Sequence, residues 1–170
     1  MRIRPAIESD LPDILAIYNH EIATSTSVYI DEPHTLEQRK EWFASKQAAK
    51  LPILVMEDET GIAAFGSYGP FRPFPGYRLC VEQSLYVAET RRRRGYGKLV
   101  ITALIETATA QGLHTMVAAI DTENEHSLEL HRTLGFTPVG HLREVACKFG
   151  RWLDLVLMQK NLDARVCPPS

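Results

Sequence analysis

The spacing of hydrophobic residues predicts a strand followed by a helix at the start of the chain. Residues 2–6 are typical of a short strand. Ser9 is placed to cap a helix that ends near Glu21. The side chains expected on its buried face are Leu11, Ile14, Leu15 and Tyr18.

A second helix is predicted after a polar stretch. Residues 23–29 are rich in hydroxyl and β-branched side chains, which indicates a loop or strand that lines something polar. Thr35 and Gln38 form a capping-box pattern at the start of the helix, which then carries Trp42 and Phe43 on its buried side.

The middle of the chain predicts a hairpin and a rigid loop. The apolar runs 53–56 and 62–68 are separated by the turn residues 57–61, which favours an antiparallel pair of strands. Three prolines and two glycines follow in residues 69–76. This composition fixes the backbone and ends the sheet pattern.

The central stretch predicts a strand, a basic loop and a helix. Residues 81–87 alternate roughly between polar and apolar, as in a strand. The cationic loop 91–98 follows, and apolar residues then recur at helical spacing until Gly112. These apolar residues are Leu99, Val100, Ala103, Leu104 and Ala108.

The last third predicts three more strands and a short helix. Residues 116–121 form an apolar run typical of a buried strand, and Asn124 is an N-cap for a helix that Gly135 ends. The closing strands are expected at 137–145 and 152–159. The predicted order, β-α-α-β-β-β-α-β-α-β-β, belongs to the mixed α/β class.

The basic loop is the strongest candidate for a ligand site. Glycines allow the backbone to turn its N–H groups toward a ligand, and the start of the helix adds partial positive charge, so a phosphate or pyrophosphate is expected here. A P-loop needs Lys-Ser/Thr, but Leu99 follows Gly97-Lys98. The dinucleotide fingerprint needs Gly or Ala where Val100 stands. The alternative is a solvated arginine run on a surface turn.

Composition sets limits on the function. The chain has 170 residues, 45% of them hydrophobic, and a formal net charge of −2, so we expect one domain over residues 1–163 with a loose tail at 164–170 and no overall attraction to nucleic acid or anionic membranes. The three cysteines lack the spacing of a zinc site or a disulfide framework. No apolar run is long enough for a signal core or a membrane span, which predicts a cytoplasmic protein.

The segment Arg-x-x-Gly-x-Gly at 92–97, directly after a strand, resembles the GNAT family of acetyl-CoA-dependent N-acyltransferases. The resemblance narrows to the phosphinothricin or methionine sulfoximine acetyltransferase branch and covers nearly the whole chain. It is carried by residues 82–87, 112–120, 130–136 and 148–154, the last being the most specific. Two positions depart from that branch: Arg93 stands where it usually has glycine, and residues 25–30 differ from its usual substrate loop.

The resemblance implies the GNAT fold, a central, mostly antiparallel sheet with a splayed parallel strand pair flanked by helices. It also implies acetyl-CoA as co-substrate, with the pyrophosphate on the backbone of the basic loop and the pantetheine arm along the strand end. The implied cofactor-binding residues are Leu85, Tyr86, Val87, Arg92, Arg93, Arg94, Gly95, Tyr96, Gly97, Lys98, Asn124 and Ser127. No metal is implied.

Acetyl transfer to an amine requires removal of a proton, because an amino-acid ammonium must become neutral before it attacks. Glu82 lies in the middle of an apolar strand, an expensive place for a carboxylate, and we predict that it is the general base, directly or through water. The alternative is a carboxylate paired with Arg78 at a sheet edge. His131 stands where most GNAT enzymes have tyrosine, and we expect it to assist thiolate departure or proton removal; the alternative is a structural hydrogen bond.

The acceptor is expected to be an anionic amino acid or analogue such as phosphinothricin, methionine sulfoximine or methionine sulfone. Arg72, Pro73, Phe74 and Arg78 are the predicted rim of its site, since arginine grips a carboxylate and Phe74 supplies an apolar wall. An ordinary exposed loop is the alternative. Residues 148–151, which include Lys148, Phe149 and Arg151, resemble a dimer contact near the partner's pocket, which implies a homodimer.

Two rival functions remain open from the sequence. One is acetylation of another small amine or of a protein N-terminus. The other is a non-catalytic module that senses acetyl-CoA or binds nucleic acid through residues 91–94. The net charge and the position of Glu82 favour the enzyme that acetylates an amino acid.

Overall fold

The computed structural model describes residues 1–167. The helices and strands follow the predicted order, which confirms the mixed α/β class. They are β1 (Arg2–Pro5), α1 (Leu11–Thr24), α2 (Leu36–Ala48), β2 (Ile53–Asp58), β3 (Gly61–Pro70), β4 (Cys80–Val87), α3 (Tyr96–Ala110), β5 (Thr115–Asp121), α4 (Glu125–Thr133), β6 (Thr137–Lys148) and β7 (Arg151–Asn161). Short 3-10 turns precede α1, β4 and α3.

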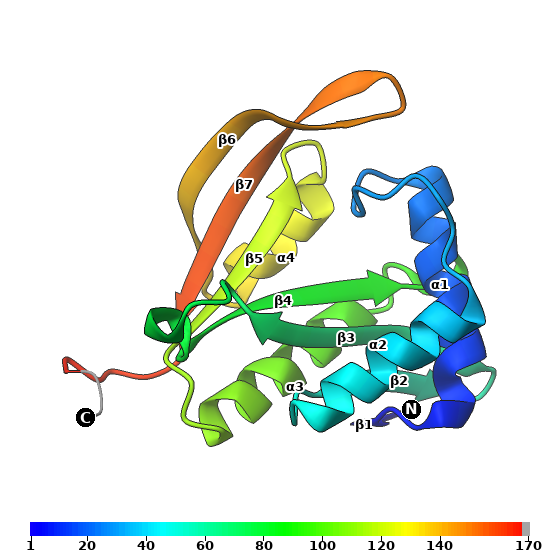
Figure 1. The fold of residues 1–170 in the computed structure, drawn as a ribbon, viewed down its shortest axis with the longest axis horizontal. Helices are drawn as coiled ribbons and strands as arrows, with labels where there is room; N and C mark the ends of the chain where they lie inside the picture. Colours follow the sequence, from blue (N-terminus) through cyan, green and yellow to red (C-terminus); the bar gives the residue numbers. More distant parts are fainter. Residues whose placement is uncertain (168–170) are drawn as a thin grey trace.

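Seven strands form one sheet in the order β1-β2-β3-β4-β5-β7-β6. All neighbouring strands are antiparallel except β4 and β5, which pair in parallel only over Cys80–Gln83 and Thr115–Ala118. Beyond these residues the two strands separate (Figure 1). The predicted sheet with a splayed parallel pair is therefore confirmed.

Helices cover both faces of the sheet, with α1 and α2 on one side and α3 and α4 on the other (Figure 1). Each face has its own apolar core. Ile14 and Ile17 of α1 pack with Phe65 in the first core. In the second, Val100 and Leu104 of α3 pack against strands from β2 to β5.

The structure shows which apolar residues of α3 are buried. Tyr96, Val100, Leu104 and Ala108 follow one another at four-residue spacing and are buried, and Ile101 is also buried. Leu99, which belongs to the predicted apolar pattern of this helix, is 45% exposed. The helix lies close to β3, because a Cβ atom at Gly66 would lie 2.7 Å from Val100 Cγ1 and 2.9 Å from Leu104 Cδ1.

Two of the three predicted helix caps are confirmed. Thr35 accepts a hydrogen bond from the Gln38 backbone, and Asn124 accepts one from the Ser127 backbone. The prediction for Ser9 was wrong, since Asp10 occupies the N-cap position of α1. The Asp10 carboxylate instead accepts hydrogen bonds from Arg4 Nη1 at 2.6 Å and Nη2 at 2.9 Å, which lowers the pKa of Asp10.

The segment after β7 is bonded to the rest of the chain through Arg165. Arg165 donates to the Asp163 carboxylate and, at 2.8 Å, to the Gly112 carbonyl. Residues 168–170 of the predicted tail lie outside the described residues. Within residues 1–167, no helix is long and apolar enough to cross a membrane.

Candidate active site

An open strand edge lies where β4 and β5 separate. Backbone groups of successive strand residues point to alternate sides. The Leu79 carbonyl accepts from Thr115 N on the β5 side, whereas the Cys80 carbonyl accepts from Phe71 N on the β3 side. Odd-numbered residues of β4 therefore face β5, so the backbone groups of Leu85 and Val87 face the opening.

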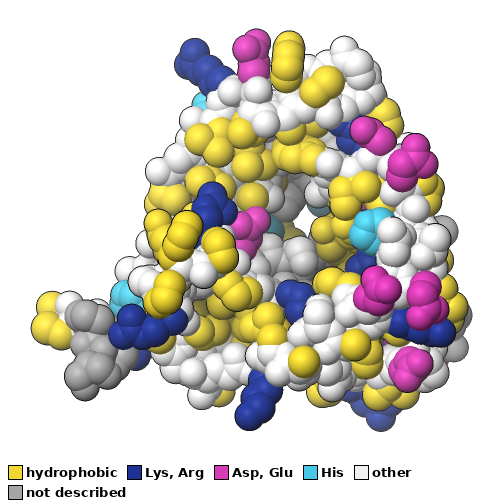
Figure 2. Space-filling view, in the orientation of Figure 1, with side chains coloured by type: hydrophobic (Ala, Val, Ile, Leu, Met, Phe, Trp, Pro, Cys, Tyr) yellow, Lys and Arg dark blue, Asp and Glu magenta, His cyan; other side chains and the backbone are white. Residues whose placement is uncertain are grey.

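The opening is a hollow in the molecular surface. Figure 2 shows it on the face that carries α1 and α2, between α1 and the strands β5 to β7. Tyr86 and Phe65 lie on the face of the sheet that α1 covers, with ring centroids 5.0 Å apart. Pairing of β4 with β5 ends at Gln83, so the strand edge that carries the backbone groups of Leu85 and Val87 is left without a neighbouring strand.

The basic loop ends at the start of α3, beside this edge. Arg93 has φ = 62° and Gly95 has φ = 81°, both in the left-handed region. No side chain caps the N-terminus of α3 at Gly95. A Cβ atom at Gly97 would lie 3.0 Å from Leu85 Cδ2, so the helix start presses against β4. Its backbone N–H groups and partial positive charge suit an anion.

The four arginines of the loop have different surroundings. Arg91 Nη1 donates to Asp58 Oδ2 at 2.6 Å, and Arg92 Nη2 donates to Glu21 Oε1. Arg93 and Arg94 are exposed, as is Lys98. Among the predicted cofactor-binding residues, Arg92 therefore has a side chain that is already bonded within the chain. The Tyr96 side chain is buried, and its hydroxyl donates to Asp58 Oδ2 at 3.2 Å.

Glu82 is partly buried on the face of β4 that carries α1 and α2. Burial raises the pKa of Glu82, and the charge of Arg72 acts in the opposite direction. Its charged neighbour is thus Arg72, where the sequence suggested Arg78 as the alternative partner. The side chain lies two residues from Cys80 and two from Ser84, which share its face.

His131 is 2% exposed and uses both ring nitrogens within the chain. Nδ1 lies 2.7 Å from the Ser127 carbonyl, which can only accept, so Nδ1 donates there. Nε2 then accepts from the Gln83 side-chain amide at 2.8 Å. Burial lowers the pKa of His131, which favours this neutral form.

His131 and Glu82 lie on opposite faces of the sheet, because the side chain of Gln83 bonds to His131. Consecutive residues of a strand point to opposite faces, and Gln83 directly follows Glu82. Gln83 Oε1 is buried and accepts no hydrogen bond from the described residues. The sequence prediction did not single out Gln83, because its bond to His131 joins residues far apart in the chain.

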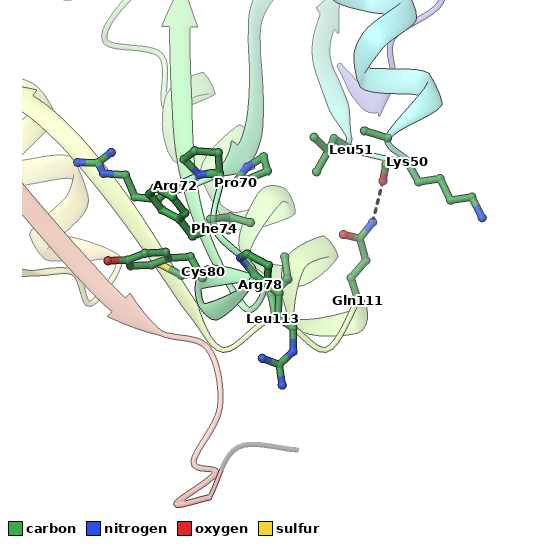
Figure 3. A pocket seen from close by; sticks show the side chains of 14 residues that line it. Lys50, Leu51, Pro70, Arg72, Phe74, Arg78, Cys80, Gln111 and Leu113 are labelled. Carbon is green, nitrogen blue, oxygen red and sulfur yellow. Dashed lines mark hydrogen bonds between the residues drawn. The ribbon is translucent and has the colours of Figure 1, made fainter. Parts of the chain in front are cut away.

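The predicted acceptor residues line a cavity of about 580 Å³ at the start of β4. Arg72, Pro73, Phe74 and Arg78 all border it, together with Cys80. The guanidinium groups of Arg72 and Arg78 extend in different directions, with Arg72 toward β5 (Figure 3). Arg72 Nη1 donates to the Phe71 carbonyl at 2.9 Å. The structure therefore brings Arg72 near Glu82 and leaves Arg78 at the outer side of the cavity.

The β6–β7 hairpin combines a buried lysine with exposed aromatic residues. Lys148 is 2% exposed and bonds to carbonyls of its own chain, while Phe149 and Trp152 are 58% and 66% exposed. Arg151 Nη1 donates to Glu123 Oε1 at 2.7 Å. Only part of the segment predicted to touch a partner is therefore on the surface.

The remaining predicted cofactor residues lie at the start of α4. Asn124 Oδ1 accepts from Ser127 N at 3.1 Å, and Asn124 Nδ2 donates to Ser27 Oγ at 3.5 Å. Among residues 1–167 no group of three or more His, Cys, Asp or Glu side chains is arranged to hold a metal ion. The three cysteines are free thiols.

Comparison with known proteins gives a consistent result. Residues 14–136 match the Acetyltransferase (GNAT) family. An L-methionine sulfoximine/L-methionine sulfone acetyltransferase of Pseudomonas aeruginosa is 48% identical over 162 residues, which are 95% of this chain and 94% of that protein.

Two solved structures are similar over almost their whole length. A GNAT superfamily phosphinothricin acetyltransferase from Sinorhizobium meliloti, in complex with AcCoA, superposes with a TM-score of 0.95 at 30% identity, covering 99% of this chain and 92% of that one. A ribosomal-protein-alanine N-acetyltransferase from Brucella melitensis has a TM-score of 0.93 at 42% identity, covering 95% and 99%.

Proposed function

Because this chain belongs to the GNAT acetyltransferase family, we propose that it acetylates the amino group of a small amino acid or analogue, of the methionine sulfoximine, methionine sulfone or phosphinothricin type. The enzyme is an acetyl-CoA-dependent N-acetyltransferase. The observation that carries the proposal is the position of Glu82 on β4, beside the point where the open edge at Leu85 and Val87 begins.

The residues around the opening fit acetyl-CoA. Leu85 and the N–H of Val87 present backbone groups that can pair with an extended amide-containing chain, as a neighbouring strand would, while the Val87 carbonyl accepts from Arg92 Nε at 3.4 Å. The uncapped start of α3 and the exposed Arg93, Arg94 and Lys98 suit a pyrophosphate. When bound, acetyl-CoA supplies the activated acetyl group. The Leu85 N–H faces the opening and is placed to polarise a carbonyl oxygen there.

Glu82 is proposed to take the proton from the amine, directly or through water. Partial burial raises the pKa of Glu82, so its carboxylate is a stronger base than one on the surface. The nearby Arg72 is proposed to hold the anionic group of the acceptor, and Phe74 to form an apolar wall. Arg72 would then orient the amino group toward Glu82.

We infer that His131, which lies on the face of β4 opposite Glu82, exchanges no proton with Glu82. Its Nε2 already accepts a hydrogen bond from Gln83. A role in thiolate departure therefore requires that Nε2 gain a proton and that the Gln83 amide turn its oxygen toward the ring. Replacement by phenylalanine, which keeps the ring contact with Phe136, tests whether the nitrogens matter to the reaction.

A homodimer is proposed from the exposed face of the hairpin. β6 is an edge strand, and Val145, Phe149 and Trp152 are 48%, 58% and 66% exposed. Val145 belongs to this edge strand, Phe149 to the turn and Trp152 to β7. A free strand edge beside exposed apolar side chains of this size is prone to contact another chain. A second copy of this chain that covers the hairpin agrees with the resemblance of residues 148–151 to a dimer contact.

The experiment is a panel of amines with acetyl-CoA, followed by detection of free thiol. We expect turnover of methionine sulfoximine, methionine sulfone or phosphinothricin with kcat/KM well above that of a simple alkylamine. Peptides with an N-terminal alanine belong in the panel, because one similar structure is a ribosomal-protein-alanine N-acetyltransferase. Preference for such a peptide over every amino-acid analogue would replace the proposed acceptor with a protein N-terminus.

A further inference from the structure

The ammonium group of Lys148 is buried although it stands at the end of an exposed hairpin strand. Nζ donates three hydrogen bonds, to the carbonyls of Ile22 at 2.6 Å, Ser25 at 2.8 Å and Val28 at 2.7 Å. An ammonium group has three donors, so all of them are used. The three acceptors belong to the last turn of α1 and to the loop that follows it.

This loop, residues 25–30, is also held at two other places. Ser25 Oγ donates to Glu21 Oε2 at 2.8 Å, which ties the loop to α1. Ser27 Oγ accepts from Asn124 Nδ2 at 3.5 Å, which brings it to the start of α4. Val28 is 6% exposed, so the loop contains a buried apolar residue as well.

These anchors lie on opposite sides of the opening between β4 and β5. α1 packs on β3 and β4, whereas β6 belongs to the other half of the sheet, beyond β5 and β7. Figure 1 shows the loop after α1 facing the end of β5 and the β5–α4 connection across the opening, with the β6–β7 turn above it. Lys148 therefore joins the two halves of the molecule through the loop.

We propose that Lys148 is a positioning residue for the amine acceptor, which holds residues 25–30 as a strap across the opening between β4 and β5. The inference rests on the proposed function, because the strap borders the space where the acceptor meets the acetyl group. Lys148 touches no reacting atom. It acts through the backbone of the strap. The basic loop, residues 91–98, has an anchor of its own in the bond between Arg91 and Asp58, besides the ion pair of Arg92 with Glu21 of α1.

Lysine suits this position better than other residues. Arginine presents its donors in a flat fork that does not converge on three carbonyls around one point. Methionine has a similar stem but no donor, and would leave the carbonyls of Ile22, Ser25 and Val28 without this partner. Lys148→Met and Lys148→Arg are therefore expected to loosen the strap, whereas Lys40→Met removes a lysine charge from the surface of α2 and serves as control.

The test combines hydrogen exchange with kinetics. In the free protein, Lys148→Met should speed the exchange of amides in residues 25–30, with α3 and β3 unchanged. The KM for the best amine of the panel should rise by about tenfold to a hundredfold, because a misplaced acceptor site loses orientation. The KM for acetyl-CoA should change by less than about twofold.

A purely structural lysine would give another pattern. Equal increases in both KM values, or unchanged exchange at residues 25–30, would overturn the proposal, as would full activity of Lys148→Met. The exchange measurement needs no substrate, so a wild-type enzyme that acetylates none of the tested amines would disprove the proposed acceptor class while the strap is still tested. Lys40→Met should match the wild type in exchange and in both KM values.

Discussion

Glu21 and Arg92 form an ion pair that joins the last turns of α1 to the basic loop, residues 91–98. The Glu21 side chain is 6% exposed and the Arg92 side chain 44%. Glu21 also accepts a hydrogen bond from Ser25 Oγ, so one carboxylate connects the basic loop with the strap formed by residues 25–30. Burial of a carboxylate is costly unless it has such partners.

Loss of the Arg92 side chain should therefore lower the free energy of unfolding. Arg92→Met leaves the Glu21 carboxylate with only a hydroxyl partner, and we expect a loss of about 2 kcal/mol, below the range for a fully buried pair because Arg92 is partly exposed. Glu21→Gln in the same background should recover part of it. Urea unfolding measures both effects. Arg94→Met is the control, and an equal loss there would contradict the role of the ion pair.

Arg93 holds a backbone conformation that favours glycine. Its φ is 62°, and a side chain in the left-handed region costs about 1–2 kcal/mol. Arg93→Gly removes this cost, but glycine loses more conformational entropy on folding, which offsets about 0.5–1 kcal/mol of the gain. The net stabilisation should therefore be about 0.5–1 kcal/mol. Arg93→Ala keeps the strain and removes the charge. Urea unfolding in which glycine is no more stable than alanine would refute this explanation.

Local chemistry in the sequence predicted most of the fold. The caps at Thr35 and Asn124 were identified correctly because each involves residues within one turn of a helix. Ser9 was a wrong cap, because Asp10 is fixed by Arg4 through a tertiary contact. Leu99 shows what helical spacing leaves open: it belongs to the apolar pattern of α3 but is 45% exposed, because packing on β3 and β4 decides which residues of the pattern are buried.

The site was less predictable, because its side chains are joined over long separations. Gln83 bonds to a residue 48 positions away, and Lys148 to one 126 positions away. The run of four arginines looks uniform in sequence, yet Arg91 and Arg92 form ion pairs within the chain while Arg93 and Arg94 are exposed. Only the fold assigns these different surroundings.

Gly66 should be intolerant of a side chain. A Cβ atom there would lie 2.7 Å from Val100 Cγ1 and 3.1 Å from the Ser84 carbonyl, so α3 must shift away from β3. Gly66→Ala is expected to destabilise the protein by about 1–3 kcal/mol. Gly76→Ala has open space around its Cβ atom and serves as control. Thermal unfolding should separate the two variants, and equal melting temperatures would contradict the close packing.

Trp152 provides a test of the proposed homodimer. Wild-type protein should elute in light-scattering chromatography at twice the mass of one chain, and Trp152→Glu should shift it toward one, because a charge at the centre of an apolar interface is left without a partner. Leu99→Glu changes an apolar residue that is 45% exposed on α3 and should leave the mass unchanged. A monomeric wild type, or a dimer insensitive to Trp152→Glu, would refute the proposed contact.

Glu82 should control both the pH dependence of the reaction and part of the pH dependence of stability. Burial raises the pKa of Glu82, with Arg72 acting in the opposite direction. Only the carboxylate accepts a proton, so kcat/KM of the wild type should rise as pH rises through this raised pKa. Glu82→Gln should lose about 10²–10⁴-fold in kcat/KM.

The contribution of Glu82 to the free energy of unfolding should fall as pH rises, whereas kcat/KM should rise. The folded chain binds the Glu82 proton more tightly than the unfolded chain does. The stabilisation that this gives is therefore complete below the pKa of Glu82 in the unfolded chain and is lost as pH rises through its pKa in the folded chain. Glu82→Gln is neutral throughout and should melt at a higher temperature than the wild type near neutral pH, with a smaller difference in acid. Glu106→Gln, an exposed carboxylate on α3, is the control for both measurements. Full activity of Glu82→Gln from about pH 6 to pH 9 would show that another group takes the proton.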